Sequence, residues 1–94
     1  MGTIYCITNL VNNKMYIGQT VRKWQERWNE HLAAGENINN NLPLYRAMRK
    51  YGKENFSISI LEQCTDDILN EREKYWIKQY NSLAPNGYNL TVGG

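Results

Sequence analysis

The sequence predicts an α+β fold in which a small three-stranded antiparallel sheet is flanked by helices. Three short segments rich in β-branched and aromatic residues have the composition of strands, and three other segments carry apolar residues at helical spacing. Their order along the chain, ββααβα, suits a sheet covered by helices. The 94 residues are enough for one hydrophobic core, so we expect a single domain over residues 1–94.

The predicted elements are joined by polar or turn-forming connections. Strands are expected over residues 3–8, 15–20 and 56–62, helices over residues 21–34, 43–51 and 65–80, a turn over residues 85–87 and an extended tail over residues 88–92. Gly35 and Gly52 are expected to end the first two helices, because glycine readily adopts the left-handed backbone found at helix ends. Pro43 is suited to opening the second helix, and Thr65 to capping the third.

The first two strands are expected to form a hairpin with a four-residue loop over residues 10–13. That loop places Tyr5 opposite Gly18 and Ile7 opposite Tyr16. Both tyrosines then project from the same face of the sheet, and Gly18 leaves room beside Tyr5 because it has no side chain. The pair is either functional or an ordinary set of cross-strand aromatics.

Composition excludes several classes of protein. The chain has no run of about 18 apolar residues that would span a membrane, and no secretion signal. Cys6 and Cys64 are too few for a disulfide framework or a Cys/His metal site, so we expect reduced thiols and a cytoplasmic location. Gly-rich phosphate loops, His-x-x-x-His and clusters of acids for two metals are also absent, while a single-metal site built on one carboxylate stays open.

The first helix carries two residues with useful chemistry on one face. Arg27 and His31 are four apart, and His31, the one histidine of the chain, lies near the stripe of Trp24, Trp28 and Leu32. A guanidinium can donate two hydrogen bonds to a phosphate, and an imidazole can move a proton near neutral pH. The alternative is a surface arginine beside a histidine at the edge of the core.

The third helix places a carboxylate on its apolar side. Glu73 falls in the middle of the stripe formed by Leu69, Trp76, Ile77 and Tyr80. A carboxylate in that position is costly without a partner, so a cation, an arginine or the rim of a cleft is expected beside it. The alternative is a structural ion pair, for example with Arg27. Near the C-terminus, Asn89 either orients a phosphate or a tyrosine, or ties down the last extended segment.

Five motifs in order resemble those of the GIY-YIG nuclease superfamily. They are Thr3-Ile4-Tyr5, Tyr16-Ile17-Gly18, the pair Arg27 and His31, Glu71-Arg72-Glu73 followed by Trp76-Ile77, and Gly87-Tyr88-Asn89. Tyr51-Gly52 and Asn55-Phe56 are similar to the family's connection before the third strand. The resemblance covers Thr3 to Gly94 and is greatest to catalytic domains of phage and intron-encoded homing endonucleases. Two positions depart from it: Thr3 stands where the family has glycine, and Asn39 stands where some homing-type members have a histidine.

The resemblance implies hydrolysis of DNA phosphodiester bonds with one Mg²⁺ or Mn²⁺ ion. The implied catalytic set is Tyr5, Tyr16, Arg27, His31, Glu73 and Asn89, and the implied substrate-binding set is Gly18, Arg27 and Asn89. Glu73 would hold the ion, and Arg27 would stabilise charge on the phosphate. Tyr5 or Tyr16 would accept the proton of the attacking water, and His31 would relay it. A tyrosine titrates near pH 10, so this role needs a neighbour that lowers its pKa.

Two other functions stay open, and so does the assembly. The chain would be a non-catalytic nucleic-acid-binding module if Tyr5 and Tyr16 stacked bases on an exposed sheet. It would be a structural or interaction domain if all these residues were core or rim. The net charge of +2 predicts weak binding to DNA by the chain alone, so we expect help either from another domain, such as a missing C-terminal DNA-binding domain, or from a small repeat interface. The oligomeric state is left open.

Overall fold

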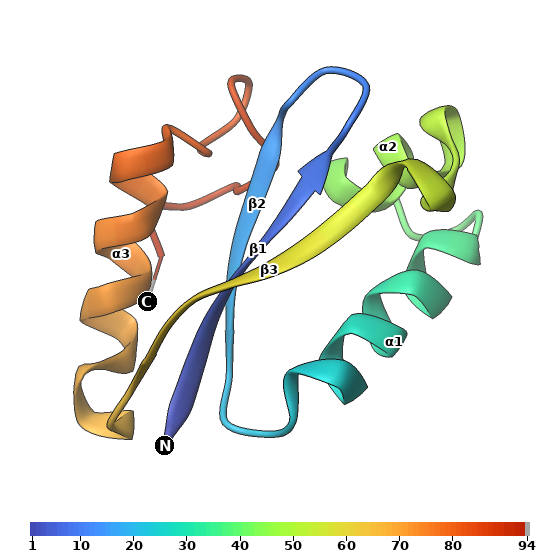
Figure 1. The fold of residues 1–94 in the computed structure, drawn as a ribbon. Helices are drawn as coiled ribbons and strands as arrows, with labels where there is room; N and C mark the ends of the chain where they lie inside the picture. The colour runs from blue at the N-terminus through green and yellow to red at the C-terminus, as the bar shows by residue number, and fades with distance from the viewer. Residues whose placement is uncertain (94) are drawn as a thin grey trace.

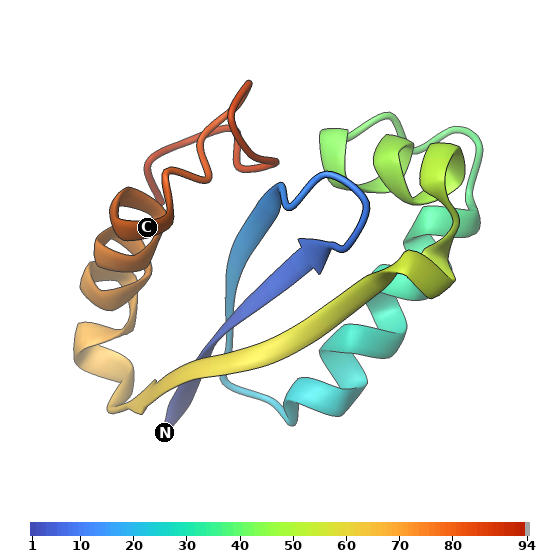
Figure 2. The same ribbon diagram turned by 45° about the horizontal axis from the view of Figure 1, so that its top comes forward.

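The computed structural model describes residues 1–93, and in it a three-stranded sheet lies between two helical layers (Figure 1). The strands are β1 (Gly2–Asn9), β2 (Met15–Thr20) and β3 (Phe56–Cys64), and the α-helices are α1 (Trp24–Glu36), α2 (Pro43–Tyr51) and α3 (Leu69–Tyr80). In Figures 1 and 2, α1 and α2 lie on one side of the sheet and α3 on the other. Gly94, the last residue of the predicted domain, lies outside the described residues.

The sheet has the strand order β2-β1-β3, and both pairs are antiparallel. Tyr5 pairs with Gly18 and Ile7 with Tyr16, so the predicted hairpin register is confirmed. The turn is built on asparagine: Asn9 accepts a hydrogen bond from the backbone N–H of Val11 through its side chain. The left-handed region, which asparagine tolerates better than most residues, is occupied at position 13 with a φ of 64°.

The third strand runs to Cys64, two residues past its predicted end, and its pairing with β1 continues beyond a β-bulge to the pair Gly2 and Cys64. Tyr5 pairs with Ile60 but Ile4 pairs with Glu62, which leaves one extra residue on β3. Before the bulge, even-numbered side chains point toward α1 and α2. After it they point toward α3, so the bulge aims Glu62 and Cys64 at α3.

The first helix begins at Trp24 and ends at Glu36, so its predicted bounds are wrong at both ends. Val21, expected as the first residue of this helix, is exposed and precedes it. Gly35 does not end the helix but lies buried inside it, where an added Cβ would come within 2.8 Å of the sulfur of Met48. This glycine therefore permits close packing between α1 and α2. The second helix has the predicted bounds, and Gly52, with a φ of 89°, ends it.

The third helix is preceded by a 3₁₀ turn (Asp66–Ile68), so the regular α-helix starts at Leu69 and not at residue 65. Thr65 comes before that turn but makes no side-chain capping bond. The predicted turn over residues 85–87 is present, because the N–H of Asn86 donates to the carbonyl oxygen of Leu83 at 3.0 Å. The tail that follows is not a strand and has one bridge, between Leu83 and Asn89.

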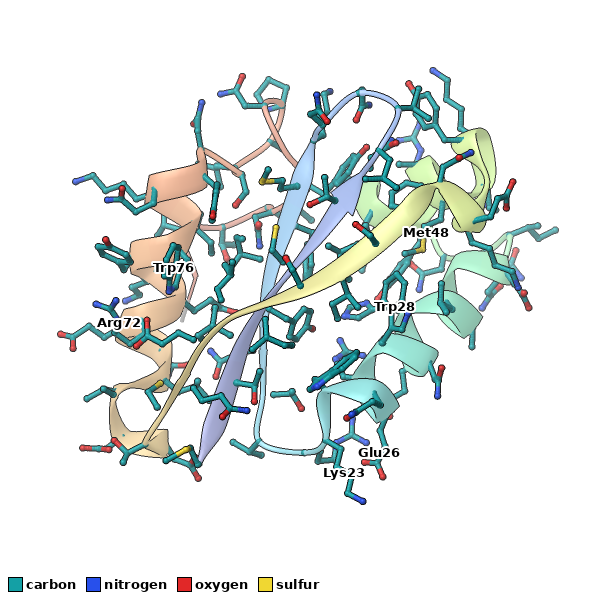
Figure 3. The ribbon with its side chains drawn as sticks, viewed as in Figure 1. Lys23, Glu26, Trp28, Met48, Arg72 and Trp76 are labelled. Carbon is teal, nitrogen blue, oxygen red and sulfur yellow. The ribbon has the colours of Figure 1, made fainter. Side chains whose placement is uncertain are left out.

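Each face of the sheet has its own core. The core toward α1 and α2 comprises Tyr5, Ile7, Leu44, Tyr45, Ala47, Met48, Phe56 and Tyr88. The core toward α3 comprises Ile4, Cys6, Ile17, Cys64, Leu69 and Ile77. Trp28 and Met48 lie on the first side and Trp76 on the second (Figure 3). Tyr80, expected in the apolar stripe of α3, is 41% exposed and stacks on Trp76 at the surface. Among the described helices, none is long and apolar enough to cross a membrane.

Candidate active site

A fully buried histidine joins two tyrosines on the α1 and α2 side of the sheet. The Nε2 atom of His31 lies 2.8 Å from the hydroxyl of Tyr5, and its Nδ1 atom lies 2.7 Å from the hydroxyl of Tyr45. His31 is 0% exposed and Tyr5 is 1% exposed. Both ring nitrogens of His31 are therefore satisfied inside the protein, in a chain of hydrogen bonds from β1 through α1 to α2.

The protonation state of this chain follows from its burial. Burial, together with the nearby Arg27 guanidinium, lowers the pKa of His31 to about 4. The imidazole is therefore neutral at physiological pH, so one ring nitrogen donates a hydrogen bond and the other accepts one. Burial also raises the pKa of Tyr5 and of Tyr45, so both phenols keep their protons.

Tyr16 and Arg27 lie beside this chain. The ring of Tyr16 packs edge-on against His31, with 5.6 Å between the ring centroids. Burial raises the pKa of Tyr16, while the positive charge of Arg27 opposes that rise and the negative charge of Glu73 adds to it. The Arg27 guanidinium also opposes the rise in the pKa of Tyr5 and of Tyr45, so its charge influences all three hydroxyl groups.

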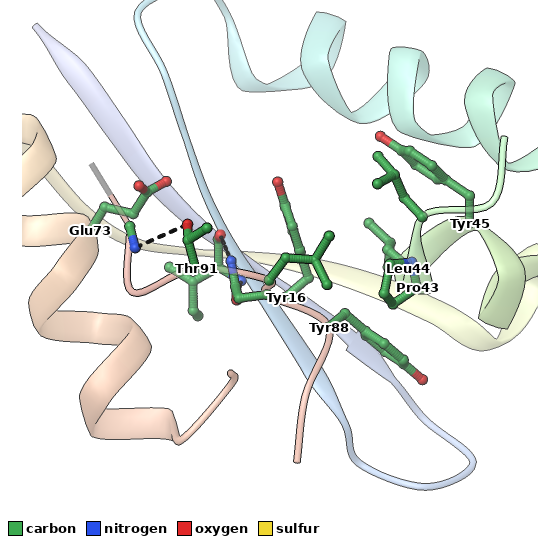
Figure 4. Close-up of a pocket in the computed structure, with 12 residues that line it drawn as sticks. Tyr16, Pro43, Leu44, Tyr45, Glu73, Tyr88 and Thr91 are labelled. Atoms are coloured by element: carbon green, nitrogen blue, oxygen red, sulfur yellow. Dashed lines mark hydrogen bonds between the residues drawn. The ribbon is translucent and has the colours of Figure 1, made fainter. Parts of the chain in front are cut away.

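A pocket of about 270 Å³ opens beside this cluster at the edge strand β2 (Figure 4). Its lining residues are Tyr16, Ile17, Leu42, Pro43, Leu44, Tyr45, Glu73, Tyr88, Asn89, Leu90, Thr91 and Gly93. The hydroxyl of Tyr16 lies between Glu73 on one side and Tyr45 on the other in Figure 4. The pocket is thus lined by a carboxylate from α3 and by hydroxyl groups from β2 and α2. The helices α3 and α2 lie on opposite faces of the sheet.

Glu73 is half-buried at the rim of this pocket, as expected of a carboxylate on an apolar stripe. It accepts a hydrogen bond of 3.3 Å from the side-chain amide of Gln19 on β2. Arg27, the partner that a purely structural interpretation would give to Glu73, forms its salt bridge with Glu30 at 3.1 Å. Within residues 1–93, no three His, Cys, Asp or Glu side chains gather as a metal-binding group.

Asn89 is buried and bonded to the edge of the sheet. Its Oδ1 accepts a 2.9 Å hydrogen bond from the N–H of Ile17, and its Nδ2 donates one of 2.9 Å to the carbonyl oxygen of Ile17. The hydroxyl of Ser82 donates to the same Oδ1 at 2.7 Å. The amide thus replaces a neighbouring strand at Ile17, next to Tyr16. Asn89 therefore ties the last segment to the sheet, which is one of the two roles predicted for it.

Gly18 lies directly beneath the ring of Tyr5. A Cβ at this position would overlap the phenol carbon and oxygen of Tyr5, so the predicted space for that ring is confirmed. Gly18 is buried under this ring and has no side chain, so a contact with substrate at this position would have to come from backbone atoms.

Tyr45 is the residue of this site that the sequence pattern did not reveal. It lies on the buried side of α2 with Leu44, Ala47 and Met48, where a tyrosine is an ordinary core residue. The available signal was a polar hydroxyl on an apolar face two residues after Pro43. Its partner, His31, is 14 positions away in the sequence, and only the packing of α1 on α2 brings them together.

The burial of Tyr5 excludes one of the alternatives. Base stacking on an open sheet requires both Tyr5 and Tyr16 on an exposed face, but α1 and α2 cover that face and Tyr5 is 1% exposed. The interpretation of the chain as a binding module with an exposed tyrosine platform is therefore wrong.

Comparison with known proteins agrees with this geometry. Residues 1–89 match the family model of the GIY-YIG catalytic domain. The chain belongs to the GIY-YIG family. It is 39% identical over 90 residues to the intron-associated endonuclease 1 of enterobacteria phage T4, and that alignment covers 93% of this chain and 36% of the phage protein. It is 40% identical over 93 residues to the endonuclease segA of the same phage, with coverage of 96% and 38%.

A solved GIY-YIG structure has the same fold. The catalytic domain of the intron endonuclease I-TevI, in a mutant form, superposes with a TM-score of 0.85 at 36% identity, covering 100% of this chain and 98% of that one. The predicted family and the predicted α+β fold are confirmed. The chain spans less than two fifths of the length of the two phage T4 endonucleases to which it was compared.

Proposed function

We propose that this chain is the catalytic domain of a DNA endonuclease that hydrolyses phosphodiester bonds with one Mg²⁺ or Mn²⁺ ion held by Glu73. The observation that carries the proposal is the pocket in which Glu73, Tyr16 and Tyr45 meet, with Arg27 close enough to influence the tyrosines. The named activities of the GIY-YIG relatives support it, because several are endonucleases.

The donor set fits a divalent cation of this kind. Mg²⁺ is bound through one or two carboxylates and keeps several waters or substrate phosphate oxygens as its other ligands. Glu73 supplies one carboxylate at the rim of a pocket with room for such ligands. When bound, the ion would polarise a phosphate oxygen and neutralise the charge that develops on it.

Tyr16 is the better candidate for accepting the proton of the attacking water. It lines the pocket, whereas Tyr5 does not and is buried against His31. Burial raises the pKa of Tyr16, so it is a poor base in the free protein. The positive charge of Arg27 acts in the opposite direction, and neutralising the nearby Glu73 would remove an influence that raises this pKa.

The remaining residues position these groups. Arg27 would stabilise charge on the phosphate, since a guanidinium stays protonated and can donate two hydrogen bonds. His31 would hold Tyr5 and Tyr45 in place and offer a path for a proton between their hydroxyls. Asn89 would fix β2 beside Tyr16 through its two hydrogen bonds to Ile17.

Nicking of supercoiled plasmid tests the proposal. We expect cutting with Mg²⁺ or Mn²⁺, none with EDTA, and at least about a 1,000-fold loss in Glu73→Ala, because an ion at the phosphate contributes several kcal/mol. Glu71→Ala is the matched control, since Glu71 is an exposed carboxylate on the same helix. Undiminished cutting by Glu73→Ala would refute the metal role. DNA binding without any cutting at high protein concentration would favour a binding module.

A further inference from the structure

A second concave surface, which we call the basic groove, adjoins the pocket. It is lined by Asn12, Lys14, Pro43, Arg46, Ala47, Lys50, Tyr51 and Tyr88, and has a volume of about 370 Å³. Three of these side chains are basic and none is acidic. The groove lies where the β1–β2 turn approaches α2, two segments at the same end of the molecule in Figures 1 and 2.

The groove and the pocket lie side by side. Pro43 and Tyr88 line both of them, and Figure 4 shows these two residues near one another at one side of the pocket. Tyr88 is held rigidly, because its hydroxyl accepts a 3.0 Å hydrogen bond from Asn9 and its backbone N–H donates to Met15. A chain of phosphates that leaves the pocket past Pro43 therefore enters the groove.

No salt bridge in the described part of the chain involves the basic side chains of the groove. Within residues 1–93, the salt bridges of basic side chains involve Arg22, Arg27, Lys53 and Arg72. Arg49 is engaged with backbone carbonyls at the end of α1. Lys14, Arg46 and Lys50 are exposed and enter none of these pairs, while Lys50 lies 5.1 Å from the ring centroid of Tyr51.

Three like charges on two elements repel one another, so bringing them together costs the folded chain electrostatic free energy. A polyanion that lies along the groove would reverse this cost and would release its own counterions. Lysine and arginine contacts to phosphates set the register of a protein on DNA without reading bases.

We infer that Lys14, Arg46 and Lys50 bind the phosphate backbone of the DNA that flanks the bond to be cut, and so hold the strand as it leaves the pocket. This inference rests on the proposed nuclease function and adds to it the path of the DNA. Binding through the groove is independent of base sequence, because the three side chains contact phosphates and not bases. It is also independent of the metal, because Glu73 lies in the pocket and does not line the groove.

The test is binding of a short fluorescent duplex, followed by anisotropy in EDTA over a range of salt concentrations. The variant Lys14→Gln/Arg46→Gln/Lys50→Gln should lose affinity by roughly tenfold or more at moderate salt. Its slope of log affinity against log salt should fall by about three, one for each phosphate contact. The loss should be equal for duplexes of unrelated sequence.

Lys78→Gln is the control for the loss of one positive charge away from the groove, because Lys78 is exposed on α3, on the other side of the sheet. Thermal melting checks that both variants fold. If affinity and salt slope change in the triple variant by no more than three times the change caused by Lys78→Gln, the groove does not hold DNA and the inference is overturned. Failure of the wild-type chain to bind any duplex would overturn it as well.

Cleavage separates this inference from the function on which it rests. With saturating protein the triple variant should cut plasmid at the wild-type rate, and only the protein concentration needed for half-maximal rate should rise. If the wild type cuts and the variant's saturation curve is unchanged, the inference fails while the nuclease function stands. If the wild type binds through the groove but never cuts, the nuclease function fails and the groove stands.

Discussion

The face of the sheet under α1 and α2 buries hydroxyl and imidazole groups, whereas the face under α3 buries mainly aliphatic side chains and thiols. On the first face, Tyr5, His31 and Tyr45 satisfy one another in the core. On the second face, the main polar network lies at the periphery, where Arg72 and Trp76 donate hydrogen bonds to Glu62 at 2.9 Å.

This difference indicates at which residues a substitution should change folding stability and the proposed activity together. Polar groups without water access must remain paired, so changes to the buried Tyr5, His31 and Tyr45 should affect both folding and chemistry. Glu73 is the exception on the second face, since it reaches the pocket from α3 at the edge of the sheet. Changes to Glu73 should therefore affect function with little effect on folding. Four further experiments can break or sharpen this contrast.

The largest effect is expected for Arg27→Ala, which removes the charge beside the tyrosines. Cleavage should fall by about 100- to 1,000-fold, the usual effect of losing one group that stabilises transition-state charge. Arg22→Ala is the control, because Arg22 also pairs with Glu30 but is more exposed. Both variants should melt close to the wild type, since exposed ion pairs contribute about 1 kcal/mol or less. A much lower melting temperature in Arg27→Ala alone would show that this arginine supports the fold and would explain the lost cleavage without a role in the chemistry.

A pH-dependent loss of stability should follow from His31. Its pKa lies at about 4 in the folded chain, below the value of 6.5 for a free histidine. Between these two values the unfolded chain binds a proton that the folded chain does not, so stability is full above pH 6.5 and falls as the pH drops toward 4. The total loss should be roughly 3 kcal/mol, at about 1.4 kcal/mol for each pH unit.

Urea unfolding at pH 7 and at pH 5 measures this loss. His31 is the one histidine of the chain, so a His31→Asn variant, although less stable, should show nearly the same unfolding free energy at both values. The carboxylate of Glu30, whose pKa Arg22 lowers to about 2, loses its contribution only at lower pH. A wild-type profile that is flat from pH 7 to pH 5 would contradict the neutral, buried histidine.

Two glycine substitutions compare the faces directly. Gly18→Ala forces a methyl group into the ring of Tyr5, which is held in place by His31, so it should cost about 1–3 kcal/mol of unfolding free energy. Gly2→Ala meets the side chain of Leu69 on the α3 face, where the flexible end of that side chain can move. Its cost should be smaller, about 1 kcal/mol or less. Chemical denaturation of both variants gives the order, and a larger cost for Gly2→Ala would reverse the contrast.

The smallest effect is expected for Tyr45→Phe, which keeps the ring and removes the hydroxyl that contacts Nδ1 of His31. The loss should be about 1 kcal/mol, because Tyr45 lines the pocket and water can replace its hydroxyl there. Tyr75→Phe, at an exposed position of α3, should change stability by less than about 0.5 kcal/mol. Equal effects of the two substitutions would show that the bond to His31 contributes nothing.

Local rules were enough for several parts of the fold. The length of the turn and the alternation of side chains set the register of β1 and β2, and Pro43 and Gly52 set the bounds of α2. These signals act over a few residues, so no distant contact was needed to interpret them. The same rules failed at Gly35, where the glycine serves the packing of Met48 and does not terminate a helix.

The sequence by itself determined which residues are candidates for the proposed chemistry: the two hairpin tyrosines, Arg27 with His31, and Glu73 on an apolar stripe. Their types and spacings are visible without a fold. Only the tertiary structure decided which of them meet, because the contacts join residues far apart in the chain. The bulge in β3, the pairing of His31 with Tyr45 and the reach of Glu73 to the edge of β2 all depend on how helices pack on opposite faces of one sheet.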